Sequence, residues 1–211
     1  MYSSKPLDAF LSELSARTPV PGGGAACALA GALGAAQGAM CAAFTTGKRF
    51  RAVEAQAAGL RSGLESLRDR FLELVDRDAQ AYKAYDAIRK LPAAAGQEQA
   101  HARRIAECRE QATGVPEETL GASLEALSLC RQLADICNMR LIPDLLVSAC
   151  LLEAAAQGAW AQVLANLESL PAAAQRRDGA TRQLKECQAL RAAVEKKVVA
   201  SLCPPGVTDR A

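Results

Sequence analysis

Aromatic and β-branched residues are scarce in this sequence. Phe, Trp and Tyr make up 4% of its 211 residues, and valine and isoleucine together number 14. Because strands are enriched in these residue types, the composition excludes an all-β protein and argues against a parallel sheet. The chain contains 46 alanines instead, and alanine is the strongest helix former. We therefore predict an all-α protein, in which close helix packing and a subunit interface compensate for small core side chains.

The sequence also lacks an excess of charge of either sign. Lys and Arg number 25 and Asp and Glu number 23, which gives a net charge of +2. No basic stripe is present, so nucleic-acid binding is not expected. The first residues, MYSSKPLDAF, do not show the basic-then-apolar order of a signal peptide, and we expect a cytoplasmic protein.

Metal ligands are few. His101 is the single histidine, and none of the eight cysteines forms a CxxC pair, so a metal site is not expected. In a cytoplasmic protein, these cysteines are predicted to be small buried hydrophobic residues rather than a disulfide framework.

A long uncharged stretch runs from Thr18 to Gly47. Residues 25–44 are long enough to cross a bilayer, but ten of these twenty are alanine and three are glycine, so the segment is only weakly apolar. We predict a helix buried inside the protein, where Gly31, Gly34 and Gly38 allow close approach of its neighbours, and no membrane association.

Apolar spacing predicts further helices separated by short breaks. No domain boundary or repeat is apparent, so residues 1–211 are predicted to form one domain with a frayed tail over about 203–211. The expected helices cover about 6–16, 25–44, 53–91, 97–113, 116–138, 144–167 and 184–203, and 171–182 is expected to be a loop.

Asp78 interrupts the apolar seam of the long helix over 53–91. A buried carboxylate must be paired or used, because burying an isolated charge is costly. Periodicity alone leaves two interpretations open: the seam has already emerged into solvent at this turn, or Asp78 is a site residue.

Three breaks between helices combine glycine or polar residues. The first, over 19–24, contains Pro21, Gly22, Gly23 and Gly24, and it is either a hinge or a loop that a ligand approaches. The second ends in Lys48 and Arg49, which form either an ordinary cationic helix end or an acid–base group at the mouth of a buried helix. The third, over 138–144, is either a site or a helix cap made by its Asp144.

Together these motifs, in this order and along essentially the whole chain, resemble one family. Its members are formiminotetrahydrofolate cyclodeaminases and methenyltetrahydrofolate cyclohydrolases. The resemblance rests on Thr18–Gly24, Thr46-Gly47-Lys48, Asp78–Tyr82, Leu91-Pro92, Val115-Pro116 and Asn138…Asp144. It implies antiparallel long helices, a homodimer, and an enzyme that needs no cofactor beyond its tetrahydrofolate substrate.

The resemblance also implies roles for individual residues. Lys48 takes the position of the catalytic lysine of the cyclohydrolases, and Asp78 that of the family's acidic residue. Pro21 and Gly22, Gly23 and Gly24 would form the loop against the pterin, and Asn138 and Asp144 match the family's joint, with Asp144 as the partner of the pterin's donor edge. Lys48, Arg49 and Arg51 also suit the carboxylates of the glutamate tail, so the alternative for Lys48 is a binding role.

The chain departs from the family at the joint between Asn138 and Asp144. Members often read Gly-Asn-x-Asn-x-x-Ser-Asp there, whereas this chain reads Cys-Asn-Met-Arg-Leu-Ile-Pro-Asp over 137–144. Lys48 favours hydrolysis of the methenyl bridge to 10-formyltetrahydrofolate. The alternatives are the cyclodeaminase reaction, which closes the bridge and releases ammonia, and a non-catalytic helical dimer that binds folate or a partner.

Overall fold

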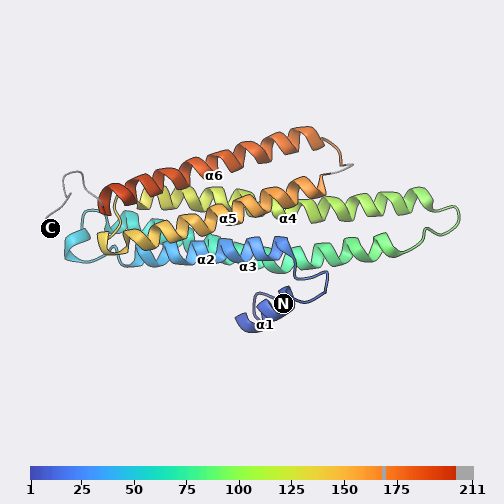
Figure 1. Ribbon diagram of the computed structural model, residues 1–211, viewed down its shortest axis with the longest axis horizontal. Helices are drawn as coiled ribbons and strands as arrows, with labels where there is room; N and C mark the ends of the chain where they lie inside the picture. Colours follow the sequence, from blue (N-terminus) through green and yellow to red (C-terminus); the bar gives the residue numbers. More distant parts are fainter. Residues whose placement is uncertain (168–169, 203–211) are drawn as a thin grey trace, which may run out of the picture.

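The computed structural model describes residues 1–167 and 170–202 and confirms the all-α prediction. Within these residues there are six α-helices, two short 3-10 helices and no strand. The long helices lie side by side along one axis of the molecule, and α1 packs outside them near the N-terminus (Figure 1). The elements are α1 (Leu7–Leu14), α2 (Gly23–Ala43), η1 (Lys48–Phe50), α3 (Glu54–Lys90), α4 (Glu98–Leu133), η2 (Met139–Leu141), α5 (Ile142–Asn166) and α6 (Ala173–Leu202).

Helix α2 packs tightly between α3 and α5. An added Cβ at Gly31 would lie 2.5 Å from the ring of Phe71 on α3, and one at Gly34 would lie 2.7 Å from Leu152 on α5. The predicted close approach at Gly31, Gly34 and Gly38 is therefore confirmed. The contacts of Gly24, Gly31 and Gly38 with Asp78, Phe71 and Leu64 repeat every seven residues, and the partner number falls as the glycine number rises. Helices α2 and α3 therefore run in opposite directions.

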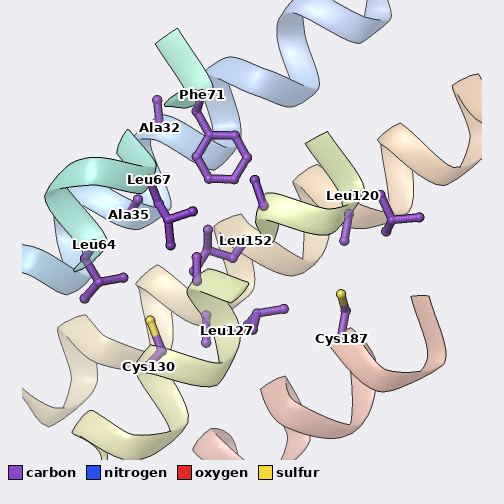
Figure 2. Packing of buried hydrophobic residues seen from close by; sticks show 14 of the residues in the cluster. Ala32, Ala35, Leu64, Leu67, Phe71, Leu120, Leu127, Cys130, Leu152 and Cys187 are labelled. Carbon is purple, nitrogen blue, oxygen red and sulfur yellow. The ribbon is translucent and has the colours of Figure 1, made fainter. Parts of the chain in front are cut away.

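The core combines the small residues of α2 with larger side chains from its neighbours. Ala32 and Ala35 face Leu64, Leu67 and Phe71, and Leu152 lies between them and α4 (Figure 2). Phe71, Leu64 and Leu152 are fully buried. Because the side chains of α2 are small, larger side chains from α3, α4 and α5 supply the volume that fills the core.

Helix α2 has the length and composition of a membrane span, with a mean hydropathy of 1.4 over its most apolar window. In this structure 56% of that window is buried among the other helices. This burial fits the predicted interior helix.

The prediction of separate helices over 97–113 and from 116 is wrong. Helix α4 continues through Pro116, although proline has no N–H for the carbonyl four residues earlier. That carbonyl belongs to Ala112, and it accepts a hydrogen bond from Nδ2 of Asn166 at 3.3 Å instead. A side chain from α5 therefore replaces the missing backbone donor.

The predicted loop over 171–182 is also wrong, because α6 begins at Ala173. Alanine at 173, 174 and 180 favours a helix. Arg176, in the first turn of α6, forms ion pairs at 2.8 Å with Glu110 and Glu117 of α4 and so holds the two helices together. The other predicted helices are present, with ends shifted by a few residues. The predicted frayed tail, 203–211, lies outside the described residues.

All seven described cysteines are free. The prediction that they are buried is confirmed for Cys41, Cys130, Cys137 and Cys187 and is wrong for exposed Cys150, and Cys27 and Cys108 are half-buried. Among the described residues, no group of three or more His, Cys, Asp or Glu side chains is arranged to hold a metal ion.

Candidate functional site at the two ends of α2

Asp78 lies against the first turn of α2. Its Oδ2 accepts a hydrogen bond from the backbone N–H of Ala25 at 2.9 Å. A Cβ at Gly24 would lie 2.0 Å from Oδ1 of the same carboxylate. The N-cap residue of α2, Gly22, has no side chain to cap the helix, so Asp78 supplies the acceptor from α3. Gly24 is required because any side chain there would displace this carboxylate.

Burial raises the pKa of Asp78 to about 6, and the hydrogen bond from Ala25 opposes this shift. The carboxylate is therefore a proton acceptor at neutral pH that takes up a proton in mildly acidic solution. A group with a pKa close to the working pH suits general acid–base chemistry.

Two further side chains that the sequence analysis did not single out lie at this end of α2. An added Cβ at Gly23 would lie 2.7 Å from Nε2 of Gln162 on α5. The thiol of Cys27 has a pKa raised to about 11, first by burial and then by the charge of Asp78. A polar residue within the otherwise apolar segment 158–164 was the signal that could have identified Gln162.

The predicted loop of Pro21, Gly22, Gly23 and Gly24 lies at the same end. Pro21 is buried and follows a cis peptide bond from Val20. Gly22 is the N-cap, and Gly23 and Gly24 already belong to the helix. Within one chain, the space beside Gly23 and Gly24 is filled by Gln162 and Asp78. These two glycines therefore make room for the polar side chains of the site.

The opposite end of α2 is tied to the joint between α4 and α5. The backbone N–H of Asn138 donates to Oγ1 of Thr45 at 3.1 Å, and its Nδ2 donates to the carbonyl of Phe44 at 3.2 Å. Its Oδ1 accepts from the N–H of Arg140 at 3.1 Å. Asn138 thus fixes the joint against the end of α2 and caps η2.

Asp144 lies in the first turn of α5, where the helix dipole favours a negative charge. Its Oδ1 accepts a hydrogen bond from Nε2 of Gln37 on α2 at 3.0 Å. The carboxylate is half-buried. It therefore links α5 to α2. The predicted cap is not formed, because the N-cap residue of α5 is Leu141 and no side chain among the described residues caps the helix.

Lys48 and Arg49 follow α2 in the short helix η1, and both are exposed. The preceding Gly47 has a φ of +90°, and its N–H donates to Oε1 of Glu54 at 3.3 Å, an atom that Thr46 also contacts. The loop before Lys48 is therefore held by Glu54, while the lysine itself makes no ion pair with any described residue.

The two predicted catalytic residues lie at opposite ends of α2. With 21 residues and a rise of about 1.5 Å per residue, the helix separates them by roughly 30 Å. One chain brings Pro21, Gly22, Gly23, Gly24 and Asp78 together at one end. It brings Lys48, Arg49, Asn138 and Asp144 together at the other.

Asp76, two residues before Asp78, has a structural role. It is buried, and its carboxylate accepts hydrogen bonds from Tyr2 N–H, from Ser3 N–H at 3.3 Å and from the Ser3 hydroxyl. These bonds hold the N-terminal segment against α3. Asp76 therefore holds the N-terminal segment in place, whereas Asp78 belongs to the candidate site.

Two open grooves lie away from both ends of α2. One of about 660 Å³ is lined by α3, α4 and α6, including Leu67, Arg70 and Glu186, and one of about 810 Å³ is lined by α4 and the start of α6. Neither contains a residue of α2 or any predicted site residue. The candidate site is therefore defined by the polar side chains at the two ends of α2, several of them half-buried, rather than by groove size.

Comparison with known proteins decides the family. Residues 6–185 match the model of the formiminotransferase-cyclodeaminase family. The chain belongs to this family. The resemblance noted in the sequence is thereby confirmed.

Two relatives illustrate how members of the formiminotransferase-cyclodeaminase family differ in length. Formimidoyltransferase-cyclodeaminase of Gallus gallus is 34% identical over 172 residues, covering 79% of this chain and 31% of the relative. Methenyltetrahydrofolate cyclohydrolase of Methylorubrum extorquens is 30% identical over 172 residues, covering 81% and 83%. This chain thus spans about a third of the length of the animal relative and most of the bacterial one.

The fold of this family member matches a solved structure, that of formiminotetrahydrofolate cyclodeaminase from Thermotoga maritima. The TM-score is 0.80 with 24% identity, over 96% of this chain and 98% of that one. At this identity the likeness supports the fold.

Proposed function

We propose that this protein is a methenyltetrahydrofolate cyclohydrolase, which hydrolyses the N5,N10-methenyl bridge to 10-formyltetrahydrofolate. The observation that carries the proposal is the match to the M. extorquens cyclohydrolase along four-fifths of both chains. Lys48, at the position expected for the catalytic lysine of cyclohydrolases, supports the same reaction.

The chemistry requires water to add to a cationic carbon held between two nitrogens. The resulting tetrahedral centre collapses as the bond from carbon to N5 breaks and N5 gains a proton. A carboxylate stabilises the cationic substrate, and a base and an acid move the protons. We assign the first role to Asp78, which is ionised at neutral pH, and the proton transfers to Lys48. Because these steps use only water and protons, the proposal includes no cofactor beyond the folate substrate.

The remaining predicted residues are assigned to binding. Pro21, Gly22, Gly23 and Gly24 carry the Asp78 end of the site, and Asn138 and Asp144 hold the joint at the Lys48 end. Arg49 is exposed beside Lys48, where its guanidinium suits a carboxylate of the glutamate tail.

The proposal requires two copies of the chain, because one copy separates Asp78 from Lys48 by the length of α2. The outward stripes of α2 and α5 are uncharged, and they contain Leu33, 50% exposed, and Val147, 52% exposed. Such a face is typical of a subunit interface. We propose that two copies of this antiparallel bundle pair through it as a homodimer.

Leu33 is the middle residue of α2, which runs from Gly23 to Ala43. In a two-fold dimer whose axis passes near Leu33, each residue before it faces a residue equally far after it in the partner. The Asp78 end of one copy then meets the Lys48 end of the other. Each dimer would contain two equivalent composite sites.

Mixing two inactive variants tests this arrangement. Lys48→Met and Asp78→Asn should each abolish turnover without unfolding the protein. After joint refolding, half of the dimers are mixed and each mixed dimer regains one intact site, so activity should return to about a quarter of the wild-type value. Failure to recover activity in dimers shown to be mixed would contradict the composite site.

The reaction itself is tested by following the methenyl chromophore. The purified protein should accelerate its loss in the presence of methenyltetrahydrofolate, and Lys48→Met should not. The cyclodeaminase alternative, favoured by the animal relatives at 34% identity, predicts instead that the chromophore forms from 5-formiminotetrahydrofolate with ammonia release. The non-catalytic alternative is motivated by the altered joint over 137–144 and predicts calorimetric folate binding without turnover of either substrate.

We also place the protein in the cytoplasm. All seven described cysteines are free thiols, which is usual in a reducing compartment.

A further inference from the structure

Gln162 differs from the other polar side chains of α5. Each of the others that is buried or half-buried and carries a polar N or O atom is bonded to a group on another helix: Asp144, Ser148, Glu153, Trp160 and Asn166. The carboxamide of half-buried Gln162 makes no hydrogen bond with any described residue. Its polar atoms therefore do not hold α5 against its neighbours.

The amide of Gln162 is accessible. Within residues 1–167 and 170–202, no buried side-chain N or O atom lacks a hydrogen-bond partner, so the unpaired amide atoms of Gln162 are not buried. Gly23, which lies beside this amide, is exposed. A ligand can therefore reach a free donor and a free acceptor at this position.

Gln162 and Asp78 flank the same turn of α2. An added Cβ at Gly23 would lie 2.7 Å from Nε2 of Gln162, and one at Gly24 would lie 2.0 Å from Oδ1 of Asp78. These glycines are consecutive, so their Cα atoms are about 3.8 Å apart. Helix α5 thus supplies an amide, and α3 a carboxylate, at one place on α2.

This pair of groups matches the substrate of the proposed function. In the pterin ring, the 4-oxo oxygen projects on the same side as N5, one of the two nitrogens that the methenyl bridge joins. A carboxylate that faces the bridge therefore has the 4-oxo oxygen close by. That oxygen accepts hydrogen bonds, and a carboxamide N–H can donate one.

We propose that Gln162 is a specificity-determining residue of the folate site, and that its Nε2 donates a hydrogen bond to the 4-oxo oxygen of the pterin. The assignment rests on the proposed function, in which Asp78 stabilises the cationic bridge. Gln162 touches a part of the ring that does not react. Its hydrogen bond therefore contributes equally to the bound substrate and to the transition state, and losing it should raise KM and leave kcat nearly unchanged.

The assignment is tested by calorimetric binding of tetrahydrofolate and of its 4-amino-4-deoxy analogue to the full chain. Gln162→Glu keeps the length of the side chain, but an ionised carboxylate only accepts hydrogen bonds. The variant should bind tetrahydrofolate about tenfold more weakly than wild type, the loss expected for one hydrogen bond. It should bind the 4-amino analogue at least as tightly as wild type, because the amino group donates.

The matched control is Gln183→Glu, which makes the same charge change at an exposed position of α6. It should leave both affinities as in wild type. A Gln162→Glu protein that keeps the wild-type affinity for tetrahydrofolate, or that weakens both compounds equally, would overturn the assignment. Gln162→Leu removes donor and acceptor together, so it should weaken both compounds and raise KM for methenyltetrahydrofolate by about tenfold.

A third ligand gives the answer even where a variant fails to fold. Wild type should bind a tetrahydrofolate analogue with hydrogen in place of the 4-oxo group about tenfold more weakly than tetrahydrofolate itself, and equal affinities would contradict the assignment. If wild type binds none of these compounds, the proposed function fails and the assignment fails with it. If wild type turns over its substrate but the Gln162 variants keep its ligand preference, only the assignment of Gln162 is wrong.

Discussion

The carboxylate of Asp78 occupies the space in which a side chain at Gly24 would begin. An added Cβ would lie 2.0 Å from Oδ1, and the other oxygen, Oδ2, accepts the N–H of Ala25 at 2.9 Å. Asp78 can therefore take this position only when residue 24 is glycine, although 53 residues lie between them in the chain.

Gly24→Ala should displace the Asp78 carboxylate and abolish turnover. Overpacking of this kind costs about 1–3 kcal/mol of unfolding free energy, which urea denaturation measures. The matched control is Gly59→Ala, an exposed position on α3 where an added Cβ meets nothing within 4 Å. Replacing that helical glycine should stabilise the protein by about 0.5–1 kcal/mol. Equal effects of the two substitutions would contradict the packing described for Gly24.

Asp78→Asn should change how stability depends on pH. The pKa of Asp78 is about 6 in the folded protein and is raised from 3.8, so the folded state holds its proton more tightly than the unfolded state. This residue therefore destabilises the wild type above pH 6, and the destabilisation disappears as the pH falls towards 4. The asparagine side chain does not titrate, so the variant avoids this destabilisation. Its unfolding free energy relative to wild type should therefore rise by about 2–3 kcal/mol from pH 4 to pH 7. Parallel curves of unfolding free energy against pH would show that Asp78 has an ordinary pKa.

Asn166→Ala should destabilise the protein by about 1–2 kcal/mol, because it leaves the carbonyl of Ala112 without its donor. Pro116→Ala restores a backbone N–H for the same carbonyl. In the Pro116→Ala background, the asparagine substitution should therefore cost measurably less. Urea denaturation of the four proteins in this double-mutant cycle gives the coupling energy. A coupling of zero would mean that Asn166 does not compensate for Pro116.

Ser3→Ala should reveal how firmly Asp76 holds the N-terminal segment. The Ser3 hydroxyl donates to the buried Asp76 carboxylate, and hydrogen bonds to charged groups contribute about 1.5–3 kcal/mol. Ser4→Ala is the control, since that exposed hydroxyl donates to the carbonyl of Met1 at 3.3 Å and to no charged group among the described residues. The control should lie within about 0.5 kcal/mol of wild type. If the two variants match in thermal midpoint, the segment contributes little to stability.

The helices and the packing of α2 could be predicted from the sequence because both follow from local patterns. Alanine content indicates helices, and glycines at 31, 34 and 38 indicate close neighbours. The continuation of α4 through Pro116 could not be predicted, because the compensating donor, Asn166, is fifty residues away. A local rule for proline is correct only when no distant side chain replaces the lost hydrogen bond.

The candidate site was predictable as a set of residues but not as an arrangement. Asp78 stood out because it breaks an apolar seam, and Lys48 because it ends an uncharged stretch. Their separation depends on α2 being straight and unbroken between them. Gln162 was overlooked because its relation to Gly23 exists only after α5 packs on α2.

The tight contacts of α2 also bear on how this sequence can diverge. Every amino acid other than glycine carries a Cβ, so at Gly24, Gly31 and Gly34 even the smallest replacement collides with a neighbour. Substitution at these positions is therefore opposed by the lack of space, whatever the function of the protein. Invariant glycines at 31 and 34 in related sequences would reflect helix spacing, whereas an invariant Gly24 would reflect the space that the Asp78 carboxylate occupies. Conservation that reflects the proposed reaction should be sought instead at Lys48, which is exposed and lies outside the packed helices.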